Sequence, residues 1–310
     1  MKTIDIISIG EILIDCIGSD LGLSLEHTTN FQRYLGGSPT NVAINAARLG
    51  LKASLVATCG KDGFGDFMLH KLQEDGVQTD YLRRSEEYPT SVIFVSKSVA
   101  TPEFIPYREA DCEIRSEQLS EAFIAQAKVY HTTSFALSKN PAQQTILEGA
   151  KMAFQQGVKL SIDINFSEKI WPNKEEATEV LGAYLAMNPL VKISEDDCYR
   201  FFGEHKTDAA IFEYFHAAGA ATICYTKGKN GVVISDTTEG IYTQKAMEIP
   251  KVIDATGAGD AFWTGFLYGY IHNKTLLESV AIAQKLASVK LQNLGGLPKQ
   301  FDVELIKNGK

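Results

Sequence analysis

Apolar residues recur along the chain with two different spacings, short β-branched runs and longer stretches with a period near 3.6 residues. Residues 4–10 form the first short run and predict a buried strand, and residues 12–17 form another apolar run. Helical spacing follows over residues 38–49, where Pro39 suits a first helical turn. The chain is therefore expected to open on strands that lead into a helix.

The same alternation continues toward the C-terminus. Further strands are predicted at residues 53–58, 128–133, 158–164, 190–193 and 221–226, and a hairpin is predicted at 231–235 and 241–245. Helices are predicted at residues 64–74, 116–125, 141–156, 174–186, 195–202, 208–218, 258–272 and 275–293. Alternating strands and helices require a mostly parallel sheet covered on both faces. The predicted fold class is α/β, doubly wound, with helices on both faces of the sheet.

One region departs from this alternation. Between residues 77 and 108 the sequence breaks into β-rich pieces at 90–96 and 103–107, separated by polar or proline-containing turns and lacking a helical period. We expect these pieces to form a small β-strand appendage, or lid, beside the main sheet.

The composition is that of a globular protein, with 310 residues, 45% hydrophobic and 22% charged. A net charge of −8 disfavours a nucleic-acid partner, because binding to phosphate backbones requires a broad basic surface. The sequence contains no apolar run near 18 residues and its N-terminus does not resemble a signal peptide, so no membrane association is expected. Five widely spaced cysteines without a C-x-x-C pair predict a reducing, cytoplasmic setting.

The sharpest local feature is the run Asp-Ala-Thr-Gly-Ala-Gly-Asp at residues 254–260, which opens a strongly apolar helical stretch. Gly257 and Gly259 permit close approach of the backbone, and the free N–H groups at a helix start form an anion site. Asp260 lies in the same turn, where its carboxylate is placed to take the proton of a hydroxyl group. This combination favours phosphoryl transfer. The alternative is that Asp260 only complements the helix dipole.

A second glycine feature is Gly-Gly-Ser-Pro-Thr-Asn at residues 36–41, where a tight turn would let sugar hydroxyls approach the main chain. The alternative is an ordinary strand-to-helix turn capped by Ser38. A Walker loop and a G-x-G-x-x-G fingerprint after the first strand are both absent from the sequence, which disfavours a P-loop protein and a dinucleotide-dependent oxidoreductase.

In order along the chain, these motifs resemble the ribokinase-like family of carbohydrate kinases, of the phosphofructokinase-B type. The resemblance rests on four motifs: Gly10-Glu11 with Asp15, Gly-Gly-x-Pro-x-Asn-Val-Ala at 36–43, Gly-x-Asp-x-Phe-Gly at 60–65, and Asp-x-Thr-Gly-Ala-Gly-Asp at 254–260. It implies ATP-dependent phosphorylation of a primary hydroxyl. It also implies a single α/β domain over residues 1–310, with a β lid built from segments near 11–17, 31–37 and 88–108.

The resemblance assigns roles to individual residues. It implies that Asp260 is the general base and that the backbone of Gly257, Ala258 and Gly259 forms the anion hole. The positions that it matches to sugar binding are Asp15, Gly36, Gly37, Asn41, Arg108 and Asn165. The positions that it matches to ATP binding are Thr226, Gly228, Gly231 and Asn293. The alternatives are a plain hairpin entry at residues 226–231 and a helix-end cap at Asn293.

The resemblance also implies cations. Magnesium is expected because it neutralises the ATP phosphates. Many family members carry Asn-x-x-Glu after a central strand, and the matching stretch here is Ser-Glu-Asp-Asp at residues 194–197, so Asp197 stands in for Glu with a shorter reach and an indirect metal contact. In some members the region of Asp254 and Thr256 binds a monovalent cation, and the resemblance allows one here.

The acceptor is the least determined feature. The segments at residues 10–15, 36–43 and 107–111 resemble those of bacterial fructokinases and of 2-keto-3-deoxygluconate kinases. Arg108 suits a sugar-acid carboxylate or a hydroxyl, but Ser167 replaces an Arg usual in both groups, so that charge is missing or has moved to Lys169. The loss of an Arg favours a neutral ketohexose, and fructose is our prediction.

Three alternatives stay open. These are a 2-keto-3-deoxygluconate kinase, another ribokinase-like sugar kinase, and a catalytically silent sugar-binding regulatory protein. The third would be expected to have lost the base or the anion hole. We also expect a homodimer formed through the β lid, because exposed strand edges and an apolar face favour pairing.

Overall fold

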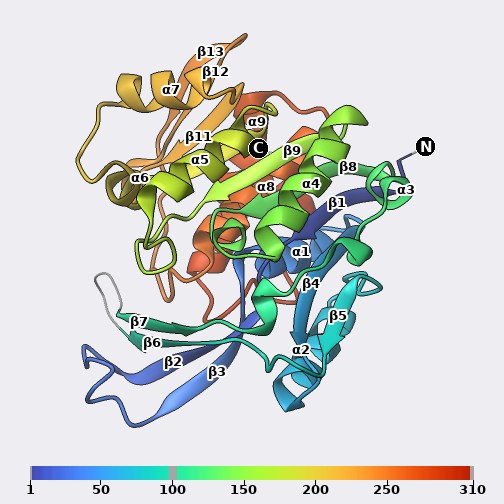
Figure 1. The fold of residues 1–310 in the computed structure, drawn as a ribbon. Coiled ribbons are helices and arrows are strands. Elements are labelled where there is room, and N and C mark those ends of the chain that lie inside the picture. The colour runs from blue at the N-terminus through green and yellow to red at the C-terminus, as the bar shows by residue number, and fades with distance from the viewer. Residues whose placement is uncertain (1, 98–102, 308–310) are drawn as a thin grey trace.

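A large sheet forms the centre of the molecule. The computed structural model describes residues 2–97 and 103–307 (Figure 1). Nine strands lie in the order β13-β12-β11-β10-β9-β8-β1-β4-β5. Their bounds are β1 Ile4–Ile9, β4 Ala53–Gly60, β5 Leu82–Ser85, β8 Ala127–Thr133, β9 Lys159–Ile164, β10 Leu190–Ser194, β11 Thr222–Thr226, β12 Val232–Asp236 and β13 Gly240–Gln244. Neighbours from β5 to β11 are parallel, and β12 and β13 form an antiparallel hairpin. This arrangement confirms the predicted α/β class.

Helices cover both faces of this sheet. Their bounds are α1 Ser38–Arg48, α2 Gly63–Glu74, α3 Glu121–Ile124, α4 Ala142–Gln155, α5 Lys174–Leu185, α6 Glu195–Phe202, α7 Asp208–Ala217, α8 Ala258–Ile271, α9 Leu276–Leu291 and α10 Val303–Lys307. Successive residues of a strand point to opposite faces, so Ile6 packs into a core layer with α1, α2, α8 and α9, and Ile7 into a second layer with α4, α5 and α7. Burial of both faces explains why these strands read as continuous apolar runs.

A separate four-stranded sheet lies beside this body (Figure 1). It consists of β2 Leu13–Leu21, β3 Phe31–Gly36, β6 Val92–Lys97 and β7 Phe104–Tyr107, in the order β3-β2-β6-β7. The segments expected to build the lid contain β3, β6 and β7 and the first part of β2, which continues to Leu21, beyond the expected 11–17. Residues 98–102 of the 88–108 segment lie outside the described residues. The strand β2 leads from Glu11 and Ile12, at the carboxyl end of β1, into this second sheet.

Two expectations about secondary structure were wrong. Residues 116–125 form a 3-10 turn, Ser116–Gln118, and a short α3 instead of one helix, because Ser120 caps α3 and Gln118 turns inward to donate to the carbonyls of Ala57 and Tyr81. In addition, β5 comes from the region assigned to the appendage but pairs with β4 as an edge strand of the large sheet.

All five cysteines are unpaired, and four of them are buried. Among the helices of residues 2–97 and 103–307, none is both long and apolar enough to span a membrane.

Candidate active site

Asp260 lies in the first turn of α8 and faces the start of α1. Ser38 Oγ donates to Asp260 Oδ1 at 2.6 Å, and Asn41 Nδ2 donates to Asp260 Oδ2 at 2.7 Å. Gly257, the N-cap residue of α8, has a φ of 73°, and no side chain caps this helix. The first backbone N–H groups of α8 have no partner within the helix, although that of Ala258 donates to the Ala255 carbonyl at 3.1 Å. A carboxylate in the same turn accepts hydrogen bonds from outside the helix. A residue that only complemented the helix dipole would not need these partners.

Gly36 and Gly37 are required for sterically different reasons. A Cβ atom on Gly36 would lie 2.3 Å from Asp15 Oδ2, so this glycine leaves room for the carboxylate. A Cβ atom on Gly37 would lie 2.2 Å from the carbonyl oxygen of Glu11, and the φ of Gly37 is 102°. Gly37 is the N-cap of α1 but has no side chain, so the cap by Ser38 that the alternative interpretation required is not formed. The Ser38 hydroxyl donates to Asp260 instead.

Asp15 lies near Asp260. Burial, and secondarily the negative charge of Asp260, raise the pKa of Asp15 to about 7. We call Asp15, Ser38, Asn41, Gly257 and Asp260 the Asp260 cluster. The Asp260 cluster brings together residues of the second sheet, α1 and α8. Its two carboxylates lie close enough for the charge of Asp260 to raise the pKa of Asp15.

Glu11 lies next to the Asp260 cluster and contacts Ser38. The sequence analysis assigned no role to Glu11. The Ser38 amide donates to Glu11 Oε1 at 3.1 Å, and Thr133 Oγ1 donates to Glu11 Oε2 at 2.9 Å. Burial raises the pKa of Glu11 to about 8, against the lowering effects of a backbone hydrogen bond, of the Thr133 hydroxyl and of the Arg108 charge. Glu11 thereby fixes the beginning of α1 against β8.

Lys192 lies beneath Gly259 of the anion hole. Its Nζ is 2.8 Å from Asp163 Oδ2, and the two side chains are only 6% and 3% exposed. A Cβ atom on Gly259 would lie 3.0 Å from Lys192 Nζ. Desolvation lowers the pKa of Lys192, but the charges of Asp163, Asp197 and Asp260 outweigh it and raise the pKa above its ordinary value. A permanent positive charge therefore lies next to the start of α8.

Arg108 and Asn165 meet at Phe135, in contact with the loop after β8. The Arg108 guanidinium lies 4.1 Å from the ring centre of Phe135, with Nη2 2.7 Å from Asp111 Oδ2 and Nη1 bonded to Ser138 Oγ. Asn165 Oδ1 accepts from the Phe135 amide at 3.0 Å. The charge of Arg108 is thus already balanced by Asp111, which bears on the choice of acceptor.

The residues expected to bind ATP lie in two places. Thr226 ends β11 and pairs with Ser194 of β10, and Gly228 begins the 3-10 turn Gly228–Asn230 that follows. Gly231 has a φ of 96°, and a Cβ atom there would lie 2.1 Å from the carbonyl oxygen of Gln244. Asn293 follows the end of α9, where its side chain donates to the Val289 carbonyl at 2.7 Å. The structure does not show a direct contact between these two groups.

Asp197, the expected indirect metal contact, is held by protein groups. Ser194 Oγ bonds to Asp197 Oδ2, and Arg200 Nη1 donates to Asp197 Oδ1 at 2.8 Å. Within residues 2–97 and 103–307, no group of three or more His, Cys, Asp or Glu side chains could hold a metal ion. Asp197 and its surroundings therefore fit a magnesium ion that is bound to nucleotide phosphates and keeps its water ligands. They do not fit a metal ion coordinated by several protein side chains.

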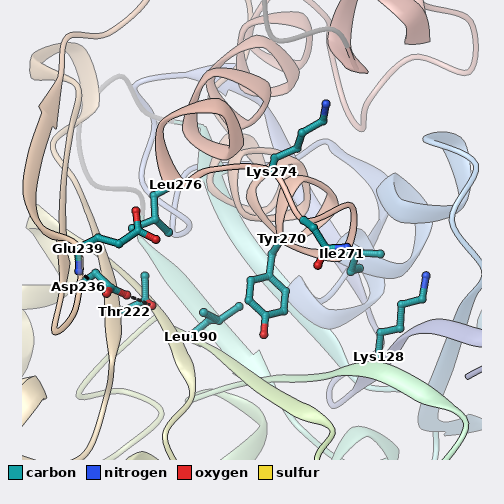
Figure 2. A pocket seen from close by; sticks show the side chains of 10 residues that line it. Lys128, Leu190, Thr222, Asp236, Glu239, Tyr270, Ile271, Lys274 and Leu276 are labelled. Atoms are coloured by element: carbon teal, nitrogen blue, oxygen red, sulfur yellow. Dashed lines mark hydrogen bonds between the residues drawn. The ribbon is translucent and has the colours of Figure 1, made fainter.

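A large cavity lies elsewhere. It has a volume of about 540 Å³, and Lys128, Leu190, Thr222, Asp236 and Tyr270 are among its lining residues (Figure 2). Lys128, Leu190 and Thr222 stand at the amino ends of their parallel strands, opposite the edge that carries Ser194 and Thr226. None of the predicted site residues lines this cavity.

Several functional candidates escaped the sequence analysis, namely Glu11, Asp163, Lys192 and Lys290. For Asp163 and Lys192 a signal was present, since each is a charged residue inside a predicted strand with an apolar residue on either side. Lys290 likewise falls on the buried face of α9 with Ala283 and Leu286. Charged residues at core positions are rarely left unpaired, and this rule would have marked them.

A helix N-terminus with a facing carboxylate, at the carboxyl edge of a doubly wound sheet, is suited to the transfer of an anionic group to a hydroxyl. The chain belongs to the pfkB family of carbohydrate kinases, because the family model matches residues 3–300. It is therefore a sugar kinase, and the family resemblance inferred from its motifs is confirmed.

Three relatives illustrate this membership. An ATP-dependent 6-phosphofructokinase of Thermoanaerobacterium thermosaccharolyticum is 34% identical over 99% of this chain and 94% of its own length. The solved structure of Halothermothrix orenii fructokinase is 31% identical, with a TM-score of 0.80 over 94% of this chain and 99% of that one. A Pyrococcus horikoshii sugar kinase solved in complex with ATP is 27% identical, with a TM-score of 0.82 over 94% of this chain and 93% of that one.

Proposed function

We propose that this chain transfers the γ-phosphoryl group of ATP to a primary hydroxyl of fructose. The observation that carries the proposal is the environment of Asp260, whose carboxylate accepts a hydroxyl hydrogen bond from Ser38 at 2.6 Å beside the uncapped start of α8. A hydroxyl oxygen therefore fits at this carboxylate. In the reaction Asp260 accepts the proton of the acceptor hydroxyl, and the N–H groups of Gly257, Ala258 and Gly259 stabilise the charge on the phosphoryl group.

The sugar is proposed to bind between the second sheet and α1, with that sheet as a lid. Asp15 and Asn41 supply a carboxylate and an amide for hydroxyl groups, and Gly36 and Gly37 let the sugar approach the backbone. Asn165, next to Phe135, would complete this set. Lys192 keeps a positive charge at the anion hole.

The charge balance around the acceptor supports a neutral sugar. Arg108 is paired with Asp111 at 2.7 Å, and Lys169 Nζ donates to the carbonyl of Phe104 at 2.9 Å. Lys169 is thus engaged elsewhere, and the charge of Arg108 is balanced by Asp111, although Arg108 Nη2 forms no hydrogen bond. This favours fructose over 2-keto-3-deoxygluconate.

ATP is proposed to lie along Thr226, Gly228 and Gly231, with Asn293 near the adenine. The relative from Pyrococcus horikoshii that was solved with ATP supports ATP as the donor. Magnesium, when bound with ATP, would neutralise phosphate charge, with Asp197 acting through water. A reducing, cytoplasmic setting stays a prediction.

A homodimer is proposed through the outer face of the second sheet. Exposed Phe31, Ile105 and Tyr107 share this face with Phe94, whose ring lies 5.2 Å from that of Phe31 and 6.0 Å from that of Tyr107. An aromatic face of this kind on an open sheet suits burial against a second copy. Light scattering should give twice the chain mass, and Ile105→Asp should give the monomer; a monomeric unaltered protein would contradict this.

The test of the catalytic proposal is ADP release with MgATP against fructose, fructose 6-phosphate, 2-keto-3-deoxygluconate, ribose and adenosine. Turnover with fructose that is abolished in Asp260→Asn supports the proposal. Turnover only with fructose 6-phosphate or the sugar acid keeps the kinase mechanism and overturns the acceptor. Binding of a sugar without any turnover would point to a silent sugar-binding protein.

A further inference from the structure

Lys290 is a buried lysine that the mechanism above does not use. It lies in the last turn of α9, and its Nζ is 3.0 Å from the carbonyl oxygen of Asp254, 3.2 Å from Asp254 Oδ2 and 3.2 Å from the carbonyl oxygen of Asn293. An ammonium has three protons to donate, and three oxygens surround this one. The Lys290 ammonium therefore connects Asp254, before α8, with Asn293, after α9.

These contacts continue into the anion hole. Asp254 Oδ1 accepts from the Thr256 amide at 2.9 Å, and Asp254 Oδ2 accepts from the Gly295 amide at 3.0 Å. A Cβ atom on Gly257 would lie 3.9 Å from Lys290 Cε. The Asp254 carboxylate therefore binds the Lys290 ammonium and also holds the backbone of Thr256, the residue before Gly257. A shift of the ammonium would therefore move the start of α8.

The surroundings of Lys290 Nζ have the chemistry of a monovalent-cation site. Two carbonyl oxygens and one carboxylate oxygen contact a single positive charge that is buried in the protein. Hard oxygen ligands of this kind suit alkali cations as well as ammonium. The sequence analysis allowed a monovalent cation near Asp254 and Thr256, and the structure brings a lysine ammonium to Asp254.

We infer that Lys290 is a tethered cation, which takes the place of a free monovalent ion and positions Gly257, Ala258 and Gly259 for the phosphoryl group. This inference rests on the proposed phosphoryl transfer. Lys290 is a positioning residue, since it reaches the reacting atoms only through Asp254 and the loop that follows. Two consequences can be measured: the unaltered protein needs no added monovalent cation, and removal of the ammonium creates a need for one.

The experiment compares the unaltered protein with Lys290→Ala and Lys290→Met in chloride salts of potassium, ammonium and tetramethylammonium at one ionic strength. Lys290→Ala leaves an oxygen cage that potassium or ammonium can enter and that tetramethylammonium is too bulky to enter. Lys290→Met retains an apolar chain of similar length in the same space. Lys274→Ala, at an exposed position before α9, is the matched control for loss of one lysine.

The first readout is the thermal unfolding midpoint, which does not depend on activity. The midpoint of Lys290→Ala should rise with potassium or ammonium in a saturable manner, whereas those of the unaltered protein, Lys290→Met and Lys274→Ala should be the same in all three salts. The second readout is kcat. In tetramethylammonium, kcat of Lys290→Ala should fall on the order of a hundredfold, because a displacement of about 1 Å at a reacting group costs that much, and potassium should restore most of it.

Two results would overturn the inference. One is activation or stabilisation of the unaltered protein by potassium over tetramethylammonium. The other is a Lys290→Ala protein whose midpoint and kcat respond to neither potassium nor ammonium. If no sugar supports turnover in any variant but the midpoint of Lys290→Ala still responds to potassium, the proposed function fails while the tethered cation stands.

Discussion

Ion pairs at the carboxyl and amino edges of the large sheet differ in their exposure to solvent. At the carboxyl edge, Lys192 and Asp163 pair at 2.8 Å with exposures of 6% and 3%. At the amino edge, Lys128 and Asp5 pair at the same 2.8 Å with exposures of 42% and 17%. Lys128 also lines the cavity of about 540 Å³ (Figure 2). This cavity and the buried charges are therefore at opposite edges.

This difference indicates that buried charge, and not the volume of this cavity, points to the edge that carries the proposed site. A charge is removed from water only at a cost, so a fold that retains buried carboxylates and ammonium groups must gain something from them. The parallel strands bring helix N-termini to their carboxyl ends, where anions bind. The amino edge lacks such a reason to bury charge, and its ion pairs remain in contact with solvent.

The strongest test of this comparison is loss of the proposed base. Asp260→Asn should reduce kcat by about 10²–10⁴, the usual contribution of a positioned general base, while the thermal midpoint changes little. Glu239→Gln, in the wall of the amino-edge cavity, is the matched change and should leave kcat unaltered. Steady-state ADP release measures both, and equal loss in the two variants would contradict the comparison.

The two ion pairs provide the next test. Lys192→Met leaves Asp163 buried without a partner and should lower the free energy of unfolding by about 3–5 kcal/mol. Lys128→Ala breaks an exposed pair and should cost less than about 1 kcal/mol. Urea unfolding gives both values. The double variant Lys192→Met with Asp163→Asn should recover part of the free energy of unfolding that Lys192→Met loses. If Lys192→Met and Lys128→Ala lowered the free energy of unfolding by similar amounts, burial would not be the cause.

A pair of glycines separates backbone strain from steric conflict. Gly37 and Gly240 have φ values of 102° and 93°, but a Cβ atom at Gly37 would meet the carbonyl oxygen of Glu11 at 2.2 Å, whereas Gly240 has open space. Gly240→Ala should cost about 1–3 kcal/mol from strain alone. Gly37→Ala should cost more and should also raise KM for the sugar, because α1 must move away from Asp260. Equal costs and an unchanged KM would rule out the steric role.

The remaining test is the pH dependence of stability. Burial and the Asp260 charge raise the pKa of Asp15 to about 7. At the amino edge, desolvation of Asp236 is outweighed by hydrogen bonds from Thr222 and the Thr238 and Glu239 amides, so its pKa lies below the ordinary value. Between about pH 4 and pH 7 the folded protein holds a proton at Asp15 that the unfolded chain has lost, so stability falls as the pH rises. Asp236 stabilises above about pH 4, and this contribution is lost as the pH falls below it.

Urea unfolding across this range measures the two effects separately. Asp15→Asn should flatten the decline between about pH 4 and pH 7, and Asp236→Asn should lower stability at neutral pH and reduce its loss in acid. A decline in Asp15→Asn as steep as in the unaltered protein would assign it to other buried carboxyls, among them Glu11.

Local patterns predicted most elements of the fold. The predicted helix over residues 38–49 corresponds to α1, Ser38–Arg48, because its apolar spacing and first-turn proline act within a few residues. The failure at residues 116–125 has a different origin. Gln118 bonds to the carbonyls of Ala57 and Tyr81, which are distant in sequence, and these contacts overrode the helical pattern.

The sequence by itself determined the family, the doubly wound class and the run of small residues at 254–260, since each depends on spacing along the chain. Only the tertiary structure decided which groups face Asp260, because Ser38 and Asn41 lie 222 and 219 positions away. It also decided that Lys290 binds Asp254, 36 positions earlier. A local pattern can indicate that a buried charge needs a partner, but the packing of helices and sheets determines which residue that partner is.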